Sequence, residues 1–124
     1  MRFSVRGERY LTRDSQFQLV YNNGRSWAGR EIVVRALPNG LDLTRYGFAV
    51  GRRVGKAVVR NRIKRRLREI LRKATLCPGW DIIVIARRPA ALADYKKLEK
   101  SVTALLIKAG IASGEYEGVR SGID

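Results

Sequence analysis

The chain of 124 residues has the size of one compact domain, and its 26 Lys and Arg residues against 11 Asp and Glu residues give a formal net charge of +15. A positive charge of this size opposes compaction unless a polyanion neutralises it, and we expect that polyanion to be nucleic acid. The sequence contains no His, so it lacks the usual general base and the commonest metal ligand, which argues against catalysis by its own side chains.

The sequence predicts a protein that stays in the cytoplasm and does not contact a membrane. No apolar run of signal-peptide type follows the basic residues near Met1, and no stretch approaches the about 20 apolar residues of a membrane span. The single Cys77 has no second Cys or His with which to form a disulfide or a zinc site. Its neighbours Leu76 and Pro78 predict that Cys77 packs as a small apolar side chain.

A short helix and two strands are expected in the first half of the chain. Thr12 is the expected N-cap of a helix that reaches about Asn22, and residues 22–24 favour its end because Asn and Gly tolerate the left-handed conformation. Residues 32–37 are β-branched at their start and are followed by a turn signal, so a strand is predicted there, and residues 46–50 predict a second one. The short connection between these strands predicts that they are antiparallel neighbours.

A long helix, a buried strand and a last helix are expected in the second half. Residues 56–76 carry apolar side chains at helical spacing. The apolar face consists of Val59, Ile63, Leu67, Ile70, Leu71 and Ala74. Residues 78–79, Pro and Gly, predict the end of this helix, and the near-continuous apolar run 80–86 is typical of a strand in the middle of a sheet. Residues 94–108 predict the last helix, with Gly110 after its end.

The order of these elements predicts the fold class. It runs helix, two or three strands, long helix, strand and helix, which indicates an α+β sandwich with helices packed against one sheet. We expect a single RNA-binding domain over residues 1–111. Residues 112–124 are rich in Gly and Ser and poor in bulky aliphatic side chains, so they predict a flexible C-terminal tail.

The strongest functional signal is the basic run from Arg52 to Lys73, in which Glu69 is the single acidic residue. The residues that we expect to contact RNA are Arg52, Arg53, Lys56, Arg60, Asn61, Arg62, Lys64, Arg65, Arg68 and Arg72. At about 100° per residue, the side chains that lie opposite the apolar stripe are Asn61, Arg65, Arg68 and Arg72. Guanidinium groups pair with phosphate oxygens, so this face predicts binding to an RNA backbone. A solvated helix face is the alternative, and the scarcity of carboxylates disfavours it.

Two further features are weaker signals. The loop 51–56 has glycines at both ends of a basic pair, which predicts an anion site beside the helix start, although a plain strand-to-helix turn explains it equally well. Phe17 and Tyr21 share one face of the first helix and can stack on unpaired bases, although core packing is the more common role of such a pair. Trp27 and Trp80 adjoin strand-like sequence and are assigned to packing.

The segment 60–69, with its Arg-Asn-Arg triplet, resembles the signature of the bacterial ribonuclease P protein component, the protein partner of a catalytic RNA that trims precursor tRNA. The resemblance extends through residues 48–59 before the motif and 81–87 after it. It implies the order helix, three strands, helix, strand, helix and a mixed sheet. It also implies a left-handed βαβ crossover, as in folds like the second domain of ribosomal protein S5.

The same resemblance implies a function. The protein would be an accessory subunit of an endoribonuclease whose RNA subunit removes the 5′ leader of precursor tRNA, with no catalytic residue and no cofactor of its own. Magnesium in the holoenzyme would be held mainly by RNA. The implied partners are the ribonuclease P RNA and precursor tRNA, with no obligate protein partner. The leader-binding cleft carried over from the family consists of Phe17, Tyr21, Val33 and Arg35.

Two positions, Arg35 and Ala49, depart from the family's pattern of an aromatic residue in the cleft and Ser before the basic turn, which leaves the base preference of the cleft open. A ribosomal or RNA-assembly protein is the alternative function, because such proteins also combine a small α+β fold with a basic helix. A self-contained metal nuclease is disfavoured, since the acidic residues form no clustered ligand motif in the sequence.

Overall fold

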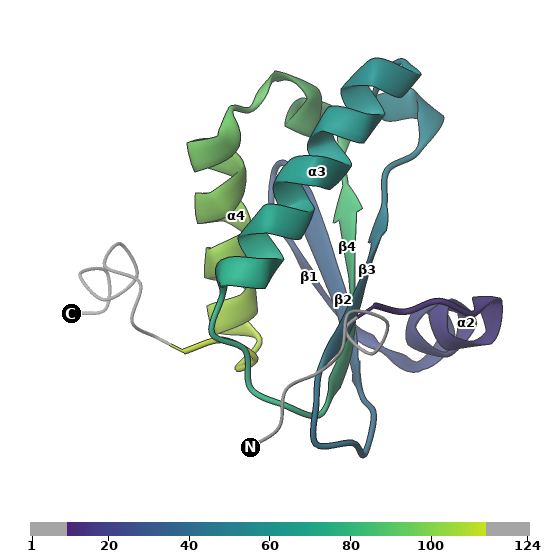
Figure 1. Ribbon diagram of the computed structural model, residues 1–124. Coiled ribbons are helices and arrows are strands. Elements are labelled where there is room, and N and C mark those ends of the chain that lie inside the picture. Colours follow the sequence, from purple (N-terminus) through teal and green to yellow (C-terminus); the bar gives the residue numbers. More distant parts are fainter. Residues whose placement is uncertain (1–9, 114–124) are drawn as a thin grey trace.

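The computed structural model describes residues 10–113, which form a mixed four-stranded sheet with helices on both faces (Figure 1). The helices are α2 (Asp14–Asn23), α3 (Ala57–Lys73) and α4 (Tyr95–Lys108), the strands are β1 (Arg25–Ala28), β2 (Ile32–Pro38), β3 (Arg45–Ala49) and β4 (Trp80–Ala86), and the 3-10 turns are η1 (Arg52–Val54) and η2 (Arg88–Leu92). This order confirms the predicted α+β class and the sequence of helix, three strands, helix, strand and helix.

The strand order in the sheet is β1-β2-β4-β3. β1 and β2 form an antiparallel hairpin, β4 runs antiparallel to β2, and β3 runs parallel to β4. The prediction that β2 and β3 are neighbours was therefore wrong, because the apolar strand β4 inserts between them and takes the hydrogen bonds of both. The segment β3-α3-β4 is the crossover between parallel strands, and its expected left hand stays a prediction.

The main core lies between the sheet and the helices α3 and α4. Alternate residues of the two central strands point to this side and are buried, among them Val34 of β2 and Val84 of β4. From the helices, Ile63 and Leu67 of α3 and Leu98 of α4 close the core. Apolar burial of this kind is the dominant favourable term in folding, so this layer holds α3 in a fixed orientation.

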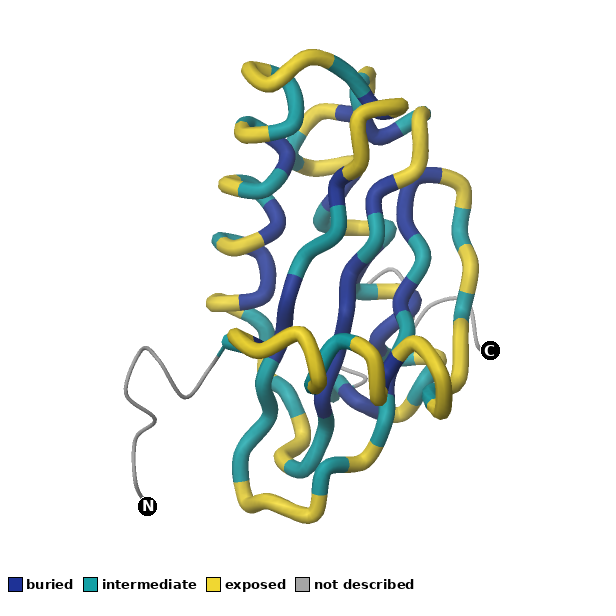
Figure 2. The backbone as a smooth tube through the Cα atoms, turned by 90° about the vertical axis from the view of Figure 1, so that its right-hand side faces the viewer, coloured by how far each residue is buried: buried dark blue, intermediate teal, exposed yellow. Residues whose placement is uncertain are grey.

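The opposite face of the sheet is covered only in part, by α2. Figure 2 shows α2 crossing the lower part of this face and leaving the upper part of the strands without a helix in front of them. Under α2, a second apolar cluster joins Leu11, Val20 and Ile83, with Phe17 packed against it. The uncovered part of the sheet face therefore begins beside the side chains of α2.

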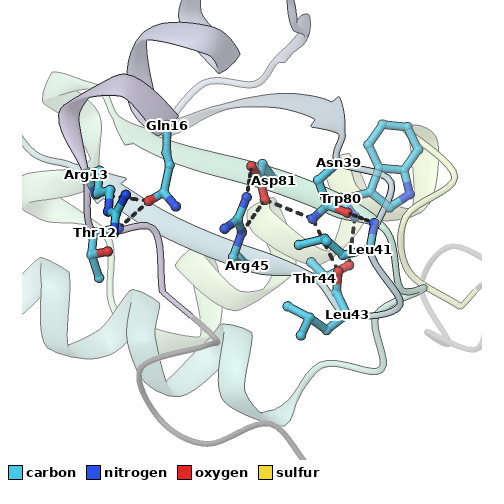
Figure 3. A network of polar contacts seen from close by, with 10 residues as sticks. All are labelled: Thr12, Arg13, Gln16, Asn39, Leu41, Leu43, Thr44, Arg45, Trp80 and Asp81. Carbon is cyan, nitrogen blue, oxygen red and sulfur yellow. Dashed lines mark hydrogen bonds and ion pairs between the residues drawn. The ribbon is translucent and has the colours of Figure 1, made fainter.

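The ends of α2 differ from the prediction. The N-cap is Arg13 rather than Thr12, and the side-chain oxygen of Gln16 accepts from both of their backbone N–H groups, at 2.9 and 2.7 Å (Figure 3). Gly24 ends the helix with φ −78°, so it is extended and not left-handed. A glycine is required there because a Cβ would lie 2.6 Å from the carbonyl oxygen of Val20.

The long helix ends earlier than predicted, at Lys73 instead of near Leu76. The next residues leave the helical conformation because Leu76 forms a β-bridge with Ala112. Cys77 is exposed, contrary to the packing role expected for it. Its backbone N–H donates to Ile111 and its carbonyl accepts from the Thr44 hydroxyl, so the main chain is held inward while the thiol points outward.

The last described residues are attached to the domain. The backbone N–H of Ala112 donates to the carbonyl of Leu106, and that of Ser113 donates to the carbonyl of Thr75. Residues 114–124 of the predicted tail lie outside the described residues, so the division at residue 111 stays a prediction.

Candidate nucleic-acid interface

The helix α3 divides into a buried side and a cationic side, as predicted. Its buried residues are Ile63, Leu67, Ile70 and Leu71, and its exposed polar residues are Asn61, Arg65, Arg68, Arg72 and Lys73. Because the apolar stripe is fixed in the main core, the cationic side cannot rotate inward. The helix therefore presents a rigid row of charges to solvent.

Arg65 and Arg68 are the freest cations of this row. Neither makes an ion pair with any residue between 10 and 113. The guanidinium carbon of Arg68 lies 6.0 Å from the ring centroid of Phe48, which places it over the β3 edge of the sheet. Two unpaired guanidinium groups on adjacent turns can each bind a phosphate through two hydrogen bonds.

Arg72 was expected to be a free RNA contact, but it is paired. Its Nη2 lies 2.7 Å from a carboxylate oxygen of Glu69, and Lys73 lies 3.5 Å from the same oxygen. The hydrogen bond from Arg72 lowers the pKa of Glu69, and Glu69 in turn raises the pKa of Arg72. The single carboxylate of the basic run therefore pairs with cations at the C-terminal end of the run, where the spacing i to i+3 brings Glu69 and Arg72 together.

Three other arginines of α3 are half-buried and bind backbone carbonyls. Arg60 donates from Nε to Gly55 at 3.0 Å, Arg62 from Nη2 to Ala91 at 3.3 Å, and Arg66 from Nη1 to Ala93 at 3.2 Å. The buried Nε of Arg62 has no hydrogen-bond partner among the described residues. Arg60 and Arg62 of the signature triplet thus hold the loops at either side of the helix start, and only part of each guanidinium group is open to a ligand.

The loop before α3 brings further cations to the same end of the molecule. Arg52, Arg53 and Lys56 are all exposed, and Lys64 on the helix is half-buried. Lys56 is the N-cap of α3 and makes no side-chain capping bond. The first backbone N–H groups of the helix therefore lie beside positive side chains, an arrangement that suits an anion. The anion site itself stays a prediction.

The predicted leader cleft corresponds to the part of the sheet that α2 leaves open. Val33 of β2, Ile85 of β4 and Ala49 of β3 lie side by side across three strands and are half-buried. Phe17 packs against Gly47, which pairs with Ile83 two residues before Ala49 and Ile85. A Cβ added at Gly47 would lie 2.6 Å from the phenyl ring. These side chains form an apolar strip across three strands that is bounded by α2.

Two predicted cleft residues lie at the edge of this strip. Tyr21 is 38% exposed, so its ring is accessible. Arg35 donates from Nη2 to the carbonyls of Tyr21 at 2.7 Å and Gly24 at 3.0 Å, which caps the C-terminus of α2. Arg35 therefore fixes α2 on the sheet, and this role explains how an arginine fits a position where an aromatic residue was expected.

The apolar strip is connected through β3 to the basic loop 51–56. Ala49 ends β3, and Gly51 begins the turn into η1 two residues later. Sequence reasoning missed Ile85 and Gly47 as site residues. The period-two alternation along β4 carried a signal for Ile85, because it places Ile83 and Ile85 on one face, whereas the contact between Gly47 and Phe17 depends on tertiary structure.

The described residues bring together no group of three or more His, Cys, Asp or Glu side chains that could hold a metal ion. Between residues 10 and 113, no helix combines the length and the apolar character that crossing a bilayer requires.

Comparisons with known proteins agree with this geometry. The family model described as Ribonuclease P matches residues 5–110. The chain is 45% identical over 114 residues to the ribonuclease P protein component of Dehalococcoides mccartyi, which covers 92% of this chain and 95% of the relative. It is 42% identical over 107 residues to that of Roseiflexus castenholzii, covering 84% of this chain and 88% of the relative.

Solved structures of the same kind of protein are similar in fold. The RNase P protein of Staphylococcus aureus is 34% identical, with a TM-score of 0.77, over 85% of this chain and 98% of that chain. The RNase P protein of Thermotoga maritima is 33% identical, with a TM-score of 0.71, over 86% of this chain and 97% of that chain.

Proposed function

The chain belongs to the ribonuclease P protein family, and we propose that it acts by binding both the catalytic RNA of ribonuclease P and the 5′ leader of precursor tRNA. The observation that carries the proposal is that Arg65 and Arg68 of α3 are exposed and make no ion pair within residues 10–113, while an open apolar strip lies on the opposite face of the sheet. The first surface suits a folded RNA backbone, and the second suits an extended single strand. One protein would thus contact the enzyme's RNA and its substrate at the same time.

The α3 surface supports binding to the catalytic RNA. Arg65 and Arg68 offer whole guanidinium groups, while Arg52, Arg53 and Lys56 extend the positive field around the helix start. Such contacts neutralise phosphates and release counterions, so the binding should weaken strongly as salt is raised. Arg60 and Arg62 contribute through the nitrogens that their carbonyl contacts leave open.

The apolar strip supports binding to the leader. A single-stranded RNA has exposed base faces, and Phe17 and Tyr21 on α2 are the rings on which those faces can stack. Val33, Ile85 and Ala49 provide a flat floor for the strand. This arrangement offers few hydrogen bonds to base edges. The affinity for the leader should therefore depend more on whether the leader is single-stranded than on its base sequence.

In this proposal, hydrolysis of the phosphodiester bond is the work of the RNA subunit. The metal ions of the holoenzyme would be held mainly by RNA, and no step is routed through an ion on the protein. The protein raises substrate affinity and screens the repulsion between two RNA molecules. Both RNAs are made in the bacterial cytoplasm, which is where we expect the protein to act.

Reconstitution with the ribonuclease P RNA at low magnesium tests the proposal. We expect the protein to increase cleavage of precursor tRNA at its mature 5′ end, and to cleave nothing alone. Arg65→Ala with Arg68→Ala should weaken binding to the RNA subunit, whereas Phe17→Ala should weaken only the binding of substrates that carry a leader. Cleavage by the protein alone, or equal effects of both variants in both assays, would overturn the proposal. Co-purification with ribosomal RNA would favour the alternative of a ribosomal or assembly protein.

A further inference from the structure

A second cationic surface lies on α4, which the proposed function does not use. The outward side of this helix carries Lys96, Lys97, Lys100 and Lys108, all of them exposed. None of the four makes an ion pair within the described part of the chain. The single acidic residue of the helix, Glu99, points to the other side, where it lines a cavity together with Lys73 of α3. The outward side of α4 is therefore positive along the helix, with the carboxylate of the N-cap Asp94 at its start, where it accepts from the backbone N–H of Lys97 at 2.9 Å.

The two cationic surfaces lie at opposite edges of the sheet. α4 packs on β2 and β1, while Arg68 of α3 reaches over Phe48 on β3, and β1 and β3 are the two edge strands. Figure 1 shows α3 and α4 side by side on one face of the sheet. A rigid RNA element held on the α3 surface would therefore leave the lysines of α4 open to another segment.

An open groove of about 500 Å³ runs between α4 and the turn that joins β1 to β2. It is lined by Glu31, Lys96, Lys97, Lys100, Ser101 and Ala104. Its one carboxylate, Glu31, is buried and lies 3.9 Å from the guanidinium of Arg30, so the rim of the groove presents cations. The groove is shallow and its lining is mostly apolar, so the contacts to a phosphate backbone would come from the lysine ammonium groups at its rim.

The residue types on the two helices differ in a way that indicates different binding modes. α3 carries six Arg and two Lys residues, whereas α4 carries four Lys and no Arg. Arginine forks bind phosphates in a fixed geometry, while lysines act as mobile point charges that tolerate many backbone positions. α4 also exposes no large hydrophobic side chain, so it offers no anchor for a lipid surface or an apolar peptide.

We propose that the α4 ridge and its groove bind the phosphodiester backbone of a second RNA segment, separate from the one held by α3 and without sequence preference. This inference rests on the proposed function, since it assumes that α3 is occupied by the catalytic RNA. Two surfaces on opposite edges let one small protein join RNA segments that would otherwise repel each other.

Lysine acetylation of the full chain, read by mass spectrometry, tests the inference without any substitution. The probes are the ribonuclease P RNA and a plain RNA duplex added as a second partner. We expect Lys64 to be protected by the first RNA, and Lys96, Lys97 and Lys100 to be protected several-fold when the duplex is added. Equal labelling of the α4 lysines with and without RNA would overturn the inference. If the duplex protected the α4 lysines but the ribonuclease P RNA, when added, did not bind the protein, the proposed function would be wrong and the inference about α4 would stand.

A variant adds an independent readout. In a protein that already carries R65A and R68A, the substitutions K96Q, K97Q and K100Q should reduce the slope of log affinity against log salt for the duplex by about 2 to 3, because each phosphate contact contributes about 0.9. Gln keeps the helix propensity of Lys, so the fold should be unchanged. E99Q, on the other side of α4, is the control and should leave the slope as it is. A slope unaffected by the triple substitution would contradict the proposed surface, as would an equal change from E99Q.

Discussion

The guanidinium of Arg62 donates a hydrogen bond to the backbone carbonyl of Ala91, 3.3 Å away. Arg66, one turn further along α3, makes the same kind of bond to Ala93 at 3.2 Å. These two side chains tie the basic helix to the segment between β4 and α4. The arginines of α3 therefore have two roles, since some face solvent while others hold the chain around the helix.

This division predicts different outcomes for neighbouring arginines. Arg62→Ala removes a half-buried donor and leaves the carbonyl of Ala91 without its partner, which should lower the free energy of unfolding by about 1 to 3 kcal/mol. Arg65→Ala, on the exposed side, should change it by less than about 0.5 kcal/mol while weakening RNA binding. Urea unfolding followed by circular dichroism measures both. Equal stability of the two variants would show that Arg62 has no structural role.

The seat of Phe17 on the sheet can be tested through Gly47. A Cβ at position 47 would lie 2.6 Å from the phenyl ring, so Gly47→Ala must push Phe17 off the sheet or shift α2. We expect a loss of stability of about 1 to 3 kcal/mol, as for other overpacked sites, together with weaker binding of leader-bearing substrate. Gly51→Ala is the matched control, because no atom lies within 4 Å of its added Cβ. A G47A protein with normal leader binding would argue against Phe17 as the stacking platform.

Glu69 limits the positive charge of α3, and its removal should strengthen RNA binding. Glu69→Gln frees both Arg72 and Lys73, which should add one or two phosphate contacts and steepen the salt slope by about 1 to 2. Filter binding with the ribonuclease P RNA at several salt concentrations measures this. If the slope of E69Q matched that of the parent protein, Arg72 and Lys73 would lie outside the interface.

The ion pair between Glu69 and Arg72 predicts how the stability of the fold depends on pH. Hydrogen bonding to Arg72 lowers the pKa of Glu69 below its ordinary value of 4.5. The contribution of the pair to stability is therefore complete above that ordinary value and is lost as the pH falls through the lower, folded-state pKa. Nuclear magnetic resonance titration of the Glu69 carboxyl carbon checks the direction. A midpoint above 4.5 would contradict the pairing.

The periodicity of the sequence was sufficient to predict most of the fold. β4 was predicted over its full extent, because a short apolar run between Pro78-Gly79 and Pro89 is typical of a buried strand. The buried side of α3 followed from helical spacing in the same way. The apolar run also predicted that β4 lies inside the sheet, but local signals did not identify its neighbours, because the pairing of β3 with β4 instead of β2 depends on contacts far apart in the chain.

The candidate site was predictable to the extent that it depends on one helix. The exposed positions of Asn61, Arg65 and Arg68 follow from their angle around α3. The partners of the remaining arginines were not predictable, since Ala91 lies 29 residues beyond Arg62 in the chain. Arg35 illustrates the same limit, because its role as a cap for α2 depends on contacts across the helix-sheet interface.

Asp81, near the start of β4 at the lower end of the sheet in Figure 1, is the centre of a polar network (Figure 3). Its two carboxylate oxygens accept from Nε and Nη2 of Arg45 at 2.8 and 2.7 Å, and one of them also accepts from the side-chain amide of Asn39 at 2.9 Å. The side chain of Asp81 is only 9% exposed, and that of Arg45 is 22% exposed. The network joins β3 to β4 and ties the loop that follows β2 to both.

Asp81→Ala should therefore destabilise the fold without changing the RNA surfaces. Removal of one partner leaves the other charge largely buried, which costs about 3 kcal/mol when solvent reaches the site only in part. Asp42→Ala is the control, because Asp42 is exposed in the same loop and forms no ion pair with the described residues. Thermal and urea unfolding should separate the two variants, and a double-mutant cycle with Arg45→Ala should show coupling between the two side chains. Since the folded fraction of D81A keeps Arg65, Arg68 and Phe17 in place, its RNA affinity per folded molecule should equal that of the parent protein, and a lower value would mean that the lower end of the sheet contributes to binding.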